Sequence, residues 1–523
     1  MNQKKGIKHI IMHGGILAMA GILVRVIGLV YRIPMVNIIG SKANGIYSTA
    51  YNVYNIMLVL SSYGLPMAVS KLVSGRVANK RYRDAKRIFI SSLSVSVCTG
   101  GVAALILFFG AGFIETHFYA AYKGISLPLK VLAPTIFIVS MLGVFRGFYQ
   151  GQGTTIPTAV SQLIEQIVNA IVSIAAGAML VKAYKDTANV NGYGAAGGTM
   201  GTAFGAFFAL AFLLIVFMVY WPSFLRKVRR DMYSEDEAYG DIVKVIIATM
   251  IPIIIGQTFY QISAAIDDIM FGKIMTGLAM TADEIQNDVG NFSSSYVILT
   301  GVVMGVASAM SASLLPSVVA SKEKREYSAI REKIGATIKA NMFIAMPSFI
   351  GLTVLGKPIV QLLFSRYDSS QGGMMLKIGA VAVVFYTVST VTSTALQGID
   401  KMNIPVIHSF ISLVVHIVLV FVLLKFTNLG IYGMVIGNAT FPIIILVLNL
   451  VSLNRYVGYR QEFIKTFIIP LVCSVFMGVF VSLTYKVFLN VTGRSIVALF
   501  FALIMAAVSY FGPIAICKKN GYY

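Results

Sequence analysis

The sequence contains little charge: only 12% of its 523 residues are Asp, Glu, Lys or Arg, against about a quarter in a typical soluble protein. Cysteine is also scarce. Cys98, Cys473 and Cys517 form no CxxC spacing, which excludes a disulfide-stapled scaffold and gives no sign of a metal or redox site. A hydrophobic share of 57% excludes a disordered chain and an ordinary cytosolic domain. The apolar residues form long runs and do not alternate with polar ones, which excludes an outer-membrane β-barrel.

Sequence signatures of enzymes are missing as well. The chain contains no GxxxxGK[ST] motif, no HExxH motif and no His/Cys set at metal-ligand spacing. Its many serines lie outside any nucleophile elbow or catalytic triad context. We therefore expect no catalytic activity, no ATP-driven transport and no bound cofactor.

The long apolar runs predict an all-α polytopic membrane protein, because each approaches or exceeds the roughly 20 residues that a helix needs to cross a bilayer. We count fourteen candidate transmembrane helices in the sequence. They cover residues 10–37, 46–73, 88–112, 127–149, 156–182, 197–221, 242–271, 292–320, 334–355, 375–397, 404–425, 430–453, 463–487 and 495–517.

The net charge of +22 is interpreted first as membrane topology. If both termini are cytoplasmic, the inside loops hold about 25 Lys and Arg and the outside loops about 12. The basic segments 76–87 and 226–230 both fall inside. This bias supports an even number of spans with both ends in the cytoplasm, and it accounts for the positive charge without a nucleic-acid partner.

Three fragments recur at a separation of about 240 residues. The second and eighth spans each end in a stretch of small residues that contains Pro, and a basic loop follows. Gln-Gly followed by Ile-Pro connects span four to span five, and the same pattern connects span ten to span eleven. Glycines at offsets 0, 3 and 7 open the sixth and twelfth spans. The order of these matches predicts two six-helix halves around a central cavity, related as a parallel repeat. The expected domains are 1–230, 231–458 and a two-helix appendage at 459–523.

Charged side chains inside a span are candidates for function, because each costs roughly 2.5–3.5 kcal/mol at mid-bilayer. The first span carries Arg25 and Arg32, seven residues apart and therefore on one helical face. Gly21 and Gly28 share that face and leave room for a ligand. Guanidinium groups bind phosphate in a bidentate manner, so this face predicts an anion site; Arg32 alternatively extends to the outer headgroups.

Other polar residues of the first half are predicted to line the same cavity. Asn52 and Asn55 lie on one face of the second span, where they bind a sugar or hold helices together. Arg146 and Gln150 lie at the inner end of the fourth span, and Glu165 lies in the fifth. Pairing of Glu165 with Arg25 or Arg146 is the first interpretation, and proton transport by Glu165 is the second.

A possible cation site lies in the seventh span. Gln261 and Asp268 are seven residues apart on one face, and Asp267 is adjacent. Neighbouring carboxylates in a helix are unfavourable unless they are protonated or bound to a cation. These residues predict a Na⁺ or H⁺ site; alternatively, both carboxylates lie near the outer surface and are hydrated.

Several of these segments together resemble the multidrug/oligosaccharidyl-lipid/polysaccharide (MOP) exporter superfamily, and most closely its MurJ/SpoVB branch, over nearly the whole chain. The resemblance rests on RVIGLVYRIP in the first span, the QG…IP hairpins, ASLLPSVVAS at the end of the eighth span and the count of fourteen spans. It implies essential arginines on the first helix, matched here by Arg25 and, with an offset of one residue, by Arg32. Relatives also use an arginine near the start of the eighth helix, where this chain has FSSSYVILTG.

The resemblance implies a flippase in the bacterial cytoplasmic membrane that moves lipid II, the undecaprenyl-diphosphate-linked peptidoglycan precursor; independently of the resemblance, we expect a monomer. The last two spans would hold the lipid tail. A flippase for another lipid-linked oligosaccharide or polysaccharide unit is the main alternative. A cation-coupled multidrug exporter and a non-transporting scaffold of wall synthesis are lesser ones. Membrane lipid and the lipid-linked glycan are the expected partners, and Na⁺ or H⁺ is the possible coupling ion.

Overall fold

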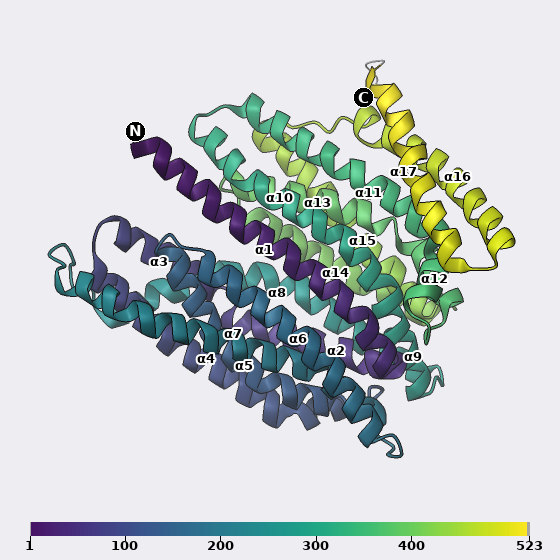
Figure 1. Ribbon diagram of the computed structural model, residues 1–523, viewed down its shortest axis with the longest axis horizontal. Coiled ribbons are helices and arrows are strands. Elements are labelled where there is room, and N and C mark those ends of the chain that lie inside the picture. The colour runs from purple at the N-terminus through teal and green to yellow at the C-terminus, as the bar shows by residue number, and fades with distance from the viewer. Residues whose placement is uncertain (1, 520–523) are drawn as a thin grey trace. The chain divides into compact units, whose positions relative to one another are not determined.

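The computed structural model describes residues 2–519, and Figure 1 shows that these residues form helices joined by short loops. Side chains are described from Ala20 onward, except those of Ile22, Pro252, Tyr260 and Ala312. The chain divides into two compact units. The first is Met1–Lys273 with Thr281–Gln286, and the second is Ile274–Met280 with Asn287–Tyr523.

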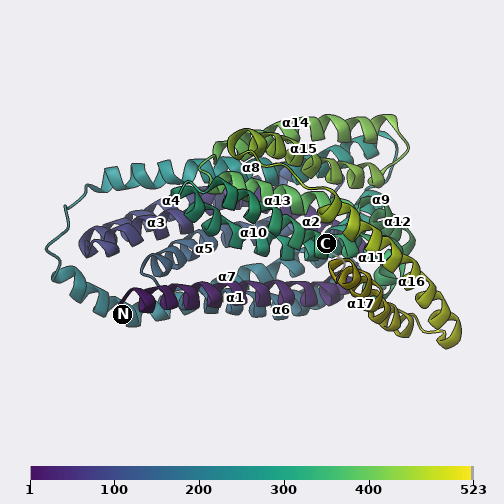
Figure 2. The same cartoon turned by 90° about the horizontal axis from the view of Figure 1, so that it is seen from above.

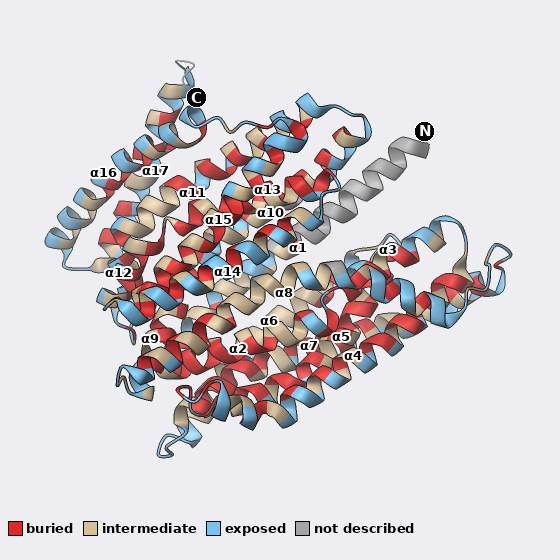
Figure 3. Cartoon of the chain, turned by 180° about the vertical axis from the view of Figure 1, so that it is seen from behind, coloured by how far each residue is buried: buried red, intermediate tan, exposed pale blue. Residues whose placement is uncertain are grey.

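The first unit is built from the helices at the N-terminal end of the chain, purple to teal in Figure 1. They are α1 (Asn2–Ile39), α2 (Ser41–Ser62), α3 (Leu65–Ala78), α4 (Tyr82–His117), α5 (Ser126–Gly151), α6 (Ile156–Ala183), α7 (Val190–Arg229), most of α8 (Tyr239–Gly277) and the start of α9 (Ala282–Asn291). Figure 3 shows buried residues along α2, α4 and α5.

The second unit runs from the end of α9 to the C-terminal hairpin, and Figure 2 shows α14 and α15 of this unit side by side. Its further elements are a π-helical turn η1 (Phe292–Ile298), α10 (Leu299–Glu323), α11 (Tyr327–Leu363), α12 (Ser369–Gly379), α13 (Ala382–Gly398), α14 (Asn403–Phe426), α15 (Ile431–Val457), a second π turn η2 (Ile464–Ile468), α16 (Ile469–Thr492) and α17 (Ser495–Lys519).

The helices agree with the predicted spans. Within residues 2–519, twelve helical segments are long and apolar enough to cross a membrane, and the bent pair of α12 and α13 makes a thirteenth. The first predicted span, 10–37, lies within α1. Each of the fourteen predicted spans therefore has a helical counterpart, and the prediction of an all-α polytopic membrane protein is confirmed.

Two predicted spans are broken where the sequence interrupts the helix. The second divides into α2 and α3 at Tyr63–Gly64, and Pro66 lies in the first turn of α3, a position that proline tolerates because its missing N–H has no helical partner there. The tenth divides into α12 and α13, which meet at an angle of 47°.

The repeated Gln-Gly fragments occupy equivalent contacts in the two units. In the first unit, a β-carbon on Gly151 of α5 would lie 2.7 Å from Cβ of Val73 on α3. In the second unit, one on Gly398 of α13 would lie 2.7 Å from Cγ1 of Val318 on α10. Val73 and Val318 both belong to the proline-containing stretches that the sequence repeat pairs. The same fragment therefore makes the same kind of helix contact twice.

The repeated glycines of α7 and α15 also lie at close helix contacts. A β-carbon on Gly197 would lie 2.7 Å from the Ala176 carbonyl oxygen of α6, and one on Gly433 would lie 3.3 Å from Leu424 of α14. Each glycine faces the helix that precedes its own along the chain. Small residues allow such an approach between membrane helices, where packing replaces the hydrophobic effect as the main attraction.

One end of the first unit carries a dense network of ion pairs, here called the linker clasp, between the α3–α4 segment and the linker that follows α7. Arg81 contacts the carboxylates of Asp84, Glu235 and Glu237, at 2.8, 2.8 and 2.6 Å. Arg76 donates two hydrogen bonds to Glu237, at 3.1 and 2.8 Å. The basic α3–α4 segment and the acidic linker therefore lie at the same end of the unit.

Asp231 anchors the start of that linker. It accepts hydrogen bonds from the backbone N–H of Arg83 at 2.7 Å and from the hydroxyl and N–H of Ser234. Burial on its own would raise the pKa of Asp231, but these hydrogen bonds outweigh burial and hold the pKa below its ordinary value. The carboxylate is therefore charged, and the linker stays attached to α4, throughout the neutral range.

The first unit thus continues past residue 230 and takes in α8 up to Lys273. The predicted domain boundaries, 1–230, 231–458 and 459–523, describe the sequence repeat and stay a prediction. The appendage of α16 and α17 packs on α11 through apolar side chains, among them Leu355, Cys473 and Leu499.

The close contact at Gly197 leads to a test of packing. Gly197→Ala places a methyl group against the backbone of α6, which cannot yield as a side chain would, so we expect a loss of about 1–3 kcal/mol in stability. The measurement is thermal unfolding of the purified protein in detergent. Gly112→Ala on α4 is the matched control, because a β-carbon there meets nothing within 4 Å. Equal melting temperatures for the two variants would contradict the packing described for α6 and α7.

Candidate functional site

The two arginines predicted on the first span both lie on α1, in different surroundings. Arg25 is exposed, and Arg32 is partly buried with its guanidinium carbon 5.6 Å from the ring centre of Tyr47 on α2. Between them, a β-carbon on Gly28 would lie 3.0 Å from Nε2 of Gln166 on α6. The predicted face therefore contacts α2 and α6 at Arg32 and Gly28, while Arg25 is accessible.

Tyrosine hydroxyls link the helices around Arg32, a feature that the sequence analysis missed. The rings of Tyr47 and Tyr51 are 4.8 Å apart, and the Tyr51 hydroxyl hydrogen-bonds Thr202 of α7. Asn169 of α6 donates a hydrogen bond to the hydroxyl of Tyr31 on α1, at 3.2 Å. The i, i+4 spacing of Tyr47 and Tyr51 was the available signal, because it places both rings on one face of the second span.

Asn52 connects α2 to the carboxylate pair of α8. Its Nδ2 donates to Oδ2 of Asp268 at 2.8 Å, so Asn52 holds α2 to α8, while its contact with a sugar stays a prediction. The backbone around Asp268 is also fixed, because the hydroxyl of Tyr122 donates to the Asp268 carbonyl at 3.0 Å. Asn55, one turn further along α2, is partly buried.

Asp267 and Asp268 are both buried, with 7% and 3% of their surfaces exposed. The alternative in which the two carboxylates are hydrated at the surface is therefore wrong for this structure. Gln261 is partly buried and lies seven residues before Asp268 on α8. Across residues 2–519, no group of three or more His, Cys, Asp and Glu could hold a metal ion. A cation here would have to be held by carboxylate and amide oxygens, the kind of ligand that hard cations take.

Arg146 and Glu165 form an ion pair between α5 and α6. The distance from Nη2 of Arg146 to Oε2 of Glu165 is 2.6 Å, and Nε of Arg146 donates to the hydroxyl of Ser161 at 3.0 Å. Pairing of Glu165 was the first prediction from the sequence, and Arg146 is the partner. Gln150 lies one turn further along α5 and is partly buried. Contact of these residues with a substrate stays a prediction.

This ion pair gives a stability test. Glu165→Gln leaves the partly buried Arg146 without its countercharge, and we expect a loss of about 1–2 kcal/mol, below the range for fully buried pairs because the side chains are 15% and 27% exposed. Thermal unfolding in detergent measures it. In the double variant Arg146→Met/Glu165→Gln, no unpaired charge remains, and part of the loss should be recovered. Additive losses in the cycle would contradict the pair.

The start of the eighth predicted span departs from an ordinary α-helix. Residues Phe292–Ile298 form the π turn η1, in which the hydroxyl of Ser295 donates to Asn291 at 2.7 Å. The hydroxyl of Tyr296 donates to the carbonyl of Gly379 and to Asn438, at 3.2 and 3.1 Å. Where an arginine was expected from the resemblance, the chain has buried serines. π turns within α-helices occur frequently at functional sites.

Membrane-length helices joined by polar contacts such as the ion pair of Arg146 and Glu165 define a polytopic membrane protein. Residues 12–320 match the family model described as "Polysaccharide biosynthesis protein", and residues 252–422 match the MatE model. The first match covers more than half of the chain. The protein therefore belongs to this family of polysaccharide biosynthesis proteins, and the predicted resemblance to the MOP superfamily is confirmed.

Two curated relatives come from Bacillus subtilis (strain 168). The chain is 25% identical to "Lipid II flippase MurJ" over 485 residues, which covers 90% of this chain and 87% of the relative. It is 22% identical to "Stage V sporulation protein B" over 468 residues, which covers 88% of this chain and 87% of the relative.

Solved structures show the same fold. "Lipid II flippase MurJ, inward closed conformation" aligns with a TM-score of 0.69 at 16% identity, covering 97% of this chain and 99% of that one. An inward-facing multidrug resistance MATE family transporter of the MOP superfamily aligns with a TM-score of 0.62 at 16% identity, covering 84% and 98%. At these identities the likeness concerns the fold alone.

Proposed function

We propose that this protein is a flippase that translocates lipid II, the undecaprenyl-diphosphate-linked peptidoglycan precursor, from the inner to the outer leaflet. The observation that supports it most is the pair of arginines on α1, in a chain similar along 90% of its length to a curated lipid II flippase. The alternative is a flippase for another lipid-linked oligosaccharide or polysaccharide unit, which the similarity to a sporulation protein and the family description also support.

The chemistry of such a substrate fits α1. A diphosphate with a sugar head cannot enter hydrocarbon unassisted, because its hydration would be lost without replacement. Arg25 is exposed, and a guanidinium can bind phosphate oxygens in a bidentate manner. Arg32, stacked near Tyr47, adds positive charge one heptad away. The isoprenoid tail stays in lipid, and rocking of one six-helix half against the other exposes the head to either side in turn.

The other predicted site residues take supporting roles in this proposal. Asn52, Asn55 and Gln150 offer amide groups to sugar hydroxyls. Arg146 and Glu165 hold α5 against α6 and add a polar surface for the head. The protein is a multi-pass bacterial membrane protein, and we propose that it works in the cytoplasmic membrane as a monomer with both termini inside. The transport role requires no catalytic chemistry, in line with transporters among its relatives.

The first test concerns Arg25. Cells depleted of their own lipid II flippase would express the wild type, Arg25→Ala or Arg494→Ala. We expect the wild type to restore lipid II on the outer leaflet and Arg25→Ala to lose this activity, because the phosphate loses its bidentate partner. Arg494 lies in the exposed loop between α16 and α17, so its substitution is the matched control. Membrane levels of each variant are compared by immunoblot.

The outcomes separate the proposals. Normal lipid II export by Arg25→Ala would overturn the cationic site on α1. A well-expressed wild type that restores no lipid II, but flips a different undecaprenyl-linked glycan in proteoliposomes, would favour the alternative. Efflux of cationic drugs without glycan transport would favour a multidrug exporter, the activity named for the MATE relatives.

A second proposal concerns coupling by Na⁺ or H⁺ at Asp267, Asp268 and Gln261. The buried Asp268 carboxylate, held by Asn52 at 2.8 Å, supports it. Asp268→Asn keeps the size of the side chain and removes its charge, so transport should lose its dependence on the Na⁺ and pH gradients. The measurement is flipping in proteoliposomes under imposed gradients. Identical gradient profiles for Asp268→Asn and the wild type would exclude this site.

A further inference from the structure

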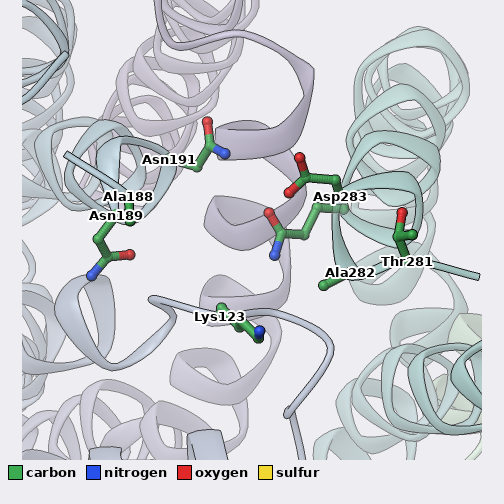
Figure 4. A pocket seen from close by; sticks show the side chains of 8 residues that line it. Lys123, Ala188, Asn189, Asn191, Thr281, Ala282 and Asp283 are labelled. Atoms are coloured by element: carbon green, nitrogen blue, oxygen red, sulfur yellow. The ribbon is translucent and has the colours of Figure 1, made fainter. Parts of the chain in front are cut away.

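The first unit contains a polar pocket at the end opposite the linker clasp. It has a volume of about 330 Å³, near the lower limit of ligand pockets. Figure 4 shows Asn191, Asp283 and Lys123 around one space, from α7, α9 and the α4–α5 loop. The full lining is Lys123, Ala188, Asn189, Asn191, Thr281, Ala282, Asp283 and Gln286. All of these residues belong to the first unit.

The loop that carries Lys123 is fixed by hydrogen bonds. The carboxylate of Glu115, at the end of α4, accepts from the backbone N–H groups of Gly124 and Ser126, both at 2.9 Å. Gly124 has φ +90°, a conformation that favours glycine. Its missing side chain also makes room for the amide oxygen of Asn189, which would collide with a β-carbon there. The α4–α5 loop and the segment that carries Asn189, which form two walls of the pocket, are thus held together.

The wall formed by α9 is fixed in a similar way. Nε2 of Gln286, which is 3% exposed, donates to the carbonyl of Ala121 at 3.1 Å. Gly45 of α2 allows the main chain of Gln286 to approach, because a β-carbon on Gly45 would lie 2.9 Å from the Gln286 carbonyl carbon. Lys42 of α2 pairs with Asp283 at 2.5 Å. The pocket is therefore formed by residues that several elements hold in place.

The lining selects one class of ligand. Its side chains are amides, a hydroxyl, one ammonium and one carboxylate, and its only apolar side chains are the methyl groups of Ala188 and Ala282. Such a set offers donors and acceptors in similar numbers. An apolar ligand would leave these groups without hydrogen bonds, and a multiply charged anion would meet the carboxylate of Asp283. A sugar fits, because each of its hydroxyls both donates and accepts.

We infer that this pocket binds one sugar unit of the glycan head that the protein translocates, on the outer side of the membrane. The position follows from the predicted topology, which puts the loops around residues 118–125, 184–189 and 278–281 outside. The inference rests on the proposed function. A sugar held there after the head leaves the arginines of α1 would favour release outward over return.

The test uses the full-length protein in nanodiscs, with glucose, galactose and N-acetylglucosamine as separate probes in saturation-transfer NMR. We expect at least one sugar to bind the wild type and to bind Asn191→Leu about ten-fold more weakly, the effect of losing about 1.4 kcal/mol. Asn79→Leu, an amide removed from an exposed position at the other end of the unit, is the matched control and should bind as the wild type does. Lys123→Ala, at an exposed side chain, serves as a second variant if Asn191→Leu unfolds.

Flipping of a lipid-linked glycan by the same variants distinguishes this inference from the proposed function. Weaker sugar binding together with slower flipping supports it. A wild type that flips glycan but binds none of the sugars, or variants that bind and flip like the wild type, would overturn the pocket and leave the flippase standing. Sugar binding that is lost in Asn191→Leu, in a protein that flips no lipid-linked glycan, would overturn the link to transport and leave a site for free saccharide.

Discussion

Close approach of helices at glycine is the constraint on which the rest of this structure depends. Membrane helices gain little from burying apolar surface against one another, because lipid is as apolar as their side chains. Here the attraction comes from backbones brought together at positions such as Gly151, Gly197, Gly398 and Gly433. The hydrogen bond between Asn52 and Asp268 and the ion pair between Arg146 and Glu165 add polar contacts between other helices, α2 with α8 and α5 with α6.

The charged groups of the first unit differ in how far they are neutralised. Arg146 has a carboxylate partner, and Asp268 has an amide partner. Arg32 lies over an aromatic ring, and Arg25 is exposed on α1. The pair of Arg146 and Glu165 holds α5 against α6, and the hydrogen bond of Asn52 to Asp268 holds α2 against α8.

The spans and the repeat could be predicted because they depend on composition along the chain. A run of about 20 apolar residues has few alternatives to a spanning helix, and the glycines of α7 and α15 recur at fixed offsets. The partner of Glu165 could not be decided between Arg25 and Arg146, since that depends on the rotation of each helix about its axis. The burial of Asp267 depends on the same rotation.

Polar contacts between distant segments were beyond sequence reasoning for a different reason. The loops that carry Lys123, Asn189 and Thr281 have no periodicity, and only the fold brings them to one pocket. The hydroxyl of Tyr31 accepts a hydrogen bond from Asn169, which lies 138 residues further along the chain. In both cases the residues are ordinary polar side chains, and their roles depend on contacts that only the folded structure creates.

The linker clasp has a consequence for how the protein enters the membrane. Arg83 is synthesised 148 residues before Asp231, its partner in the clasp. During that interval the arginines of the α3–α4 segment have no acidic linker to pair with, and positive charge is what retains a loop on the cytoplasmic side. On the predicted topology, orientation is thus decided while the loop is basic. The acidic linker is synthesised later, and its carboxylates then pair with the arginines of the loop, so residues that first orient the chain afterwards hold the linker to α3 and α4.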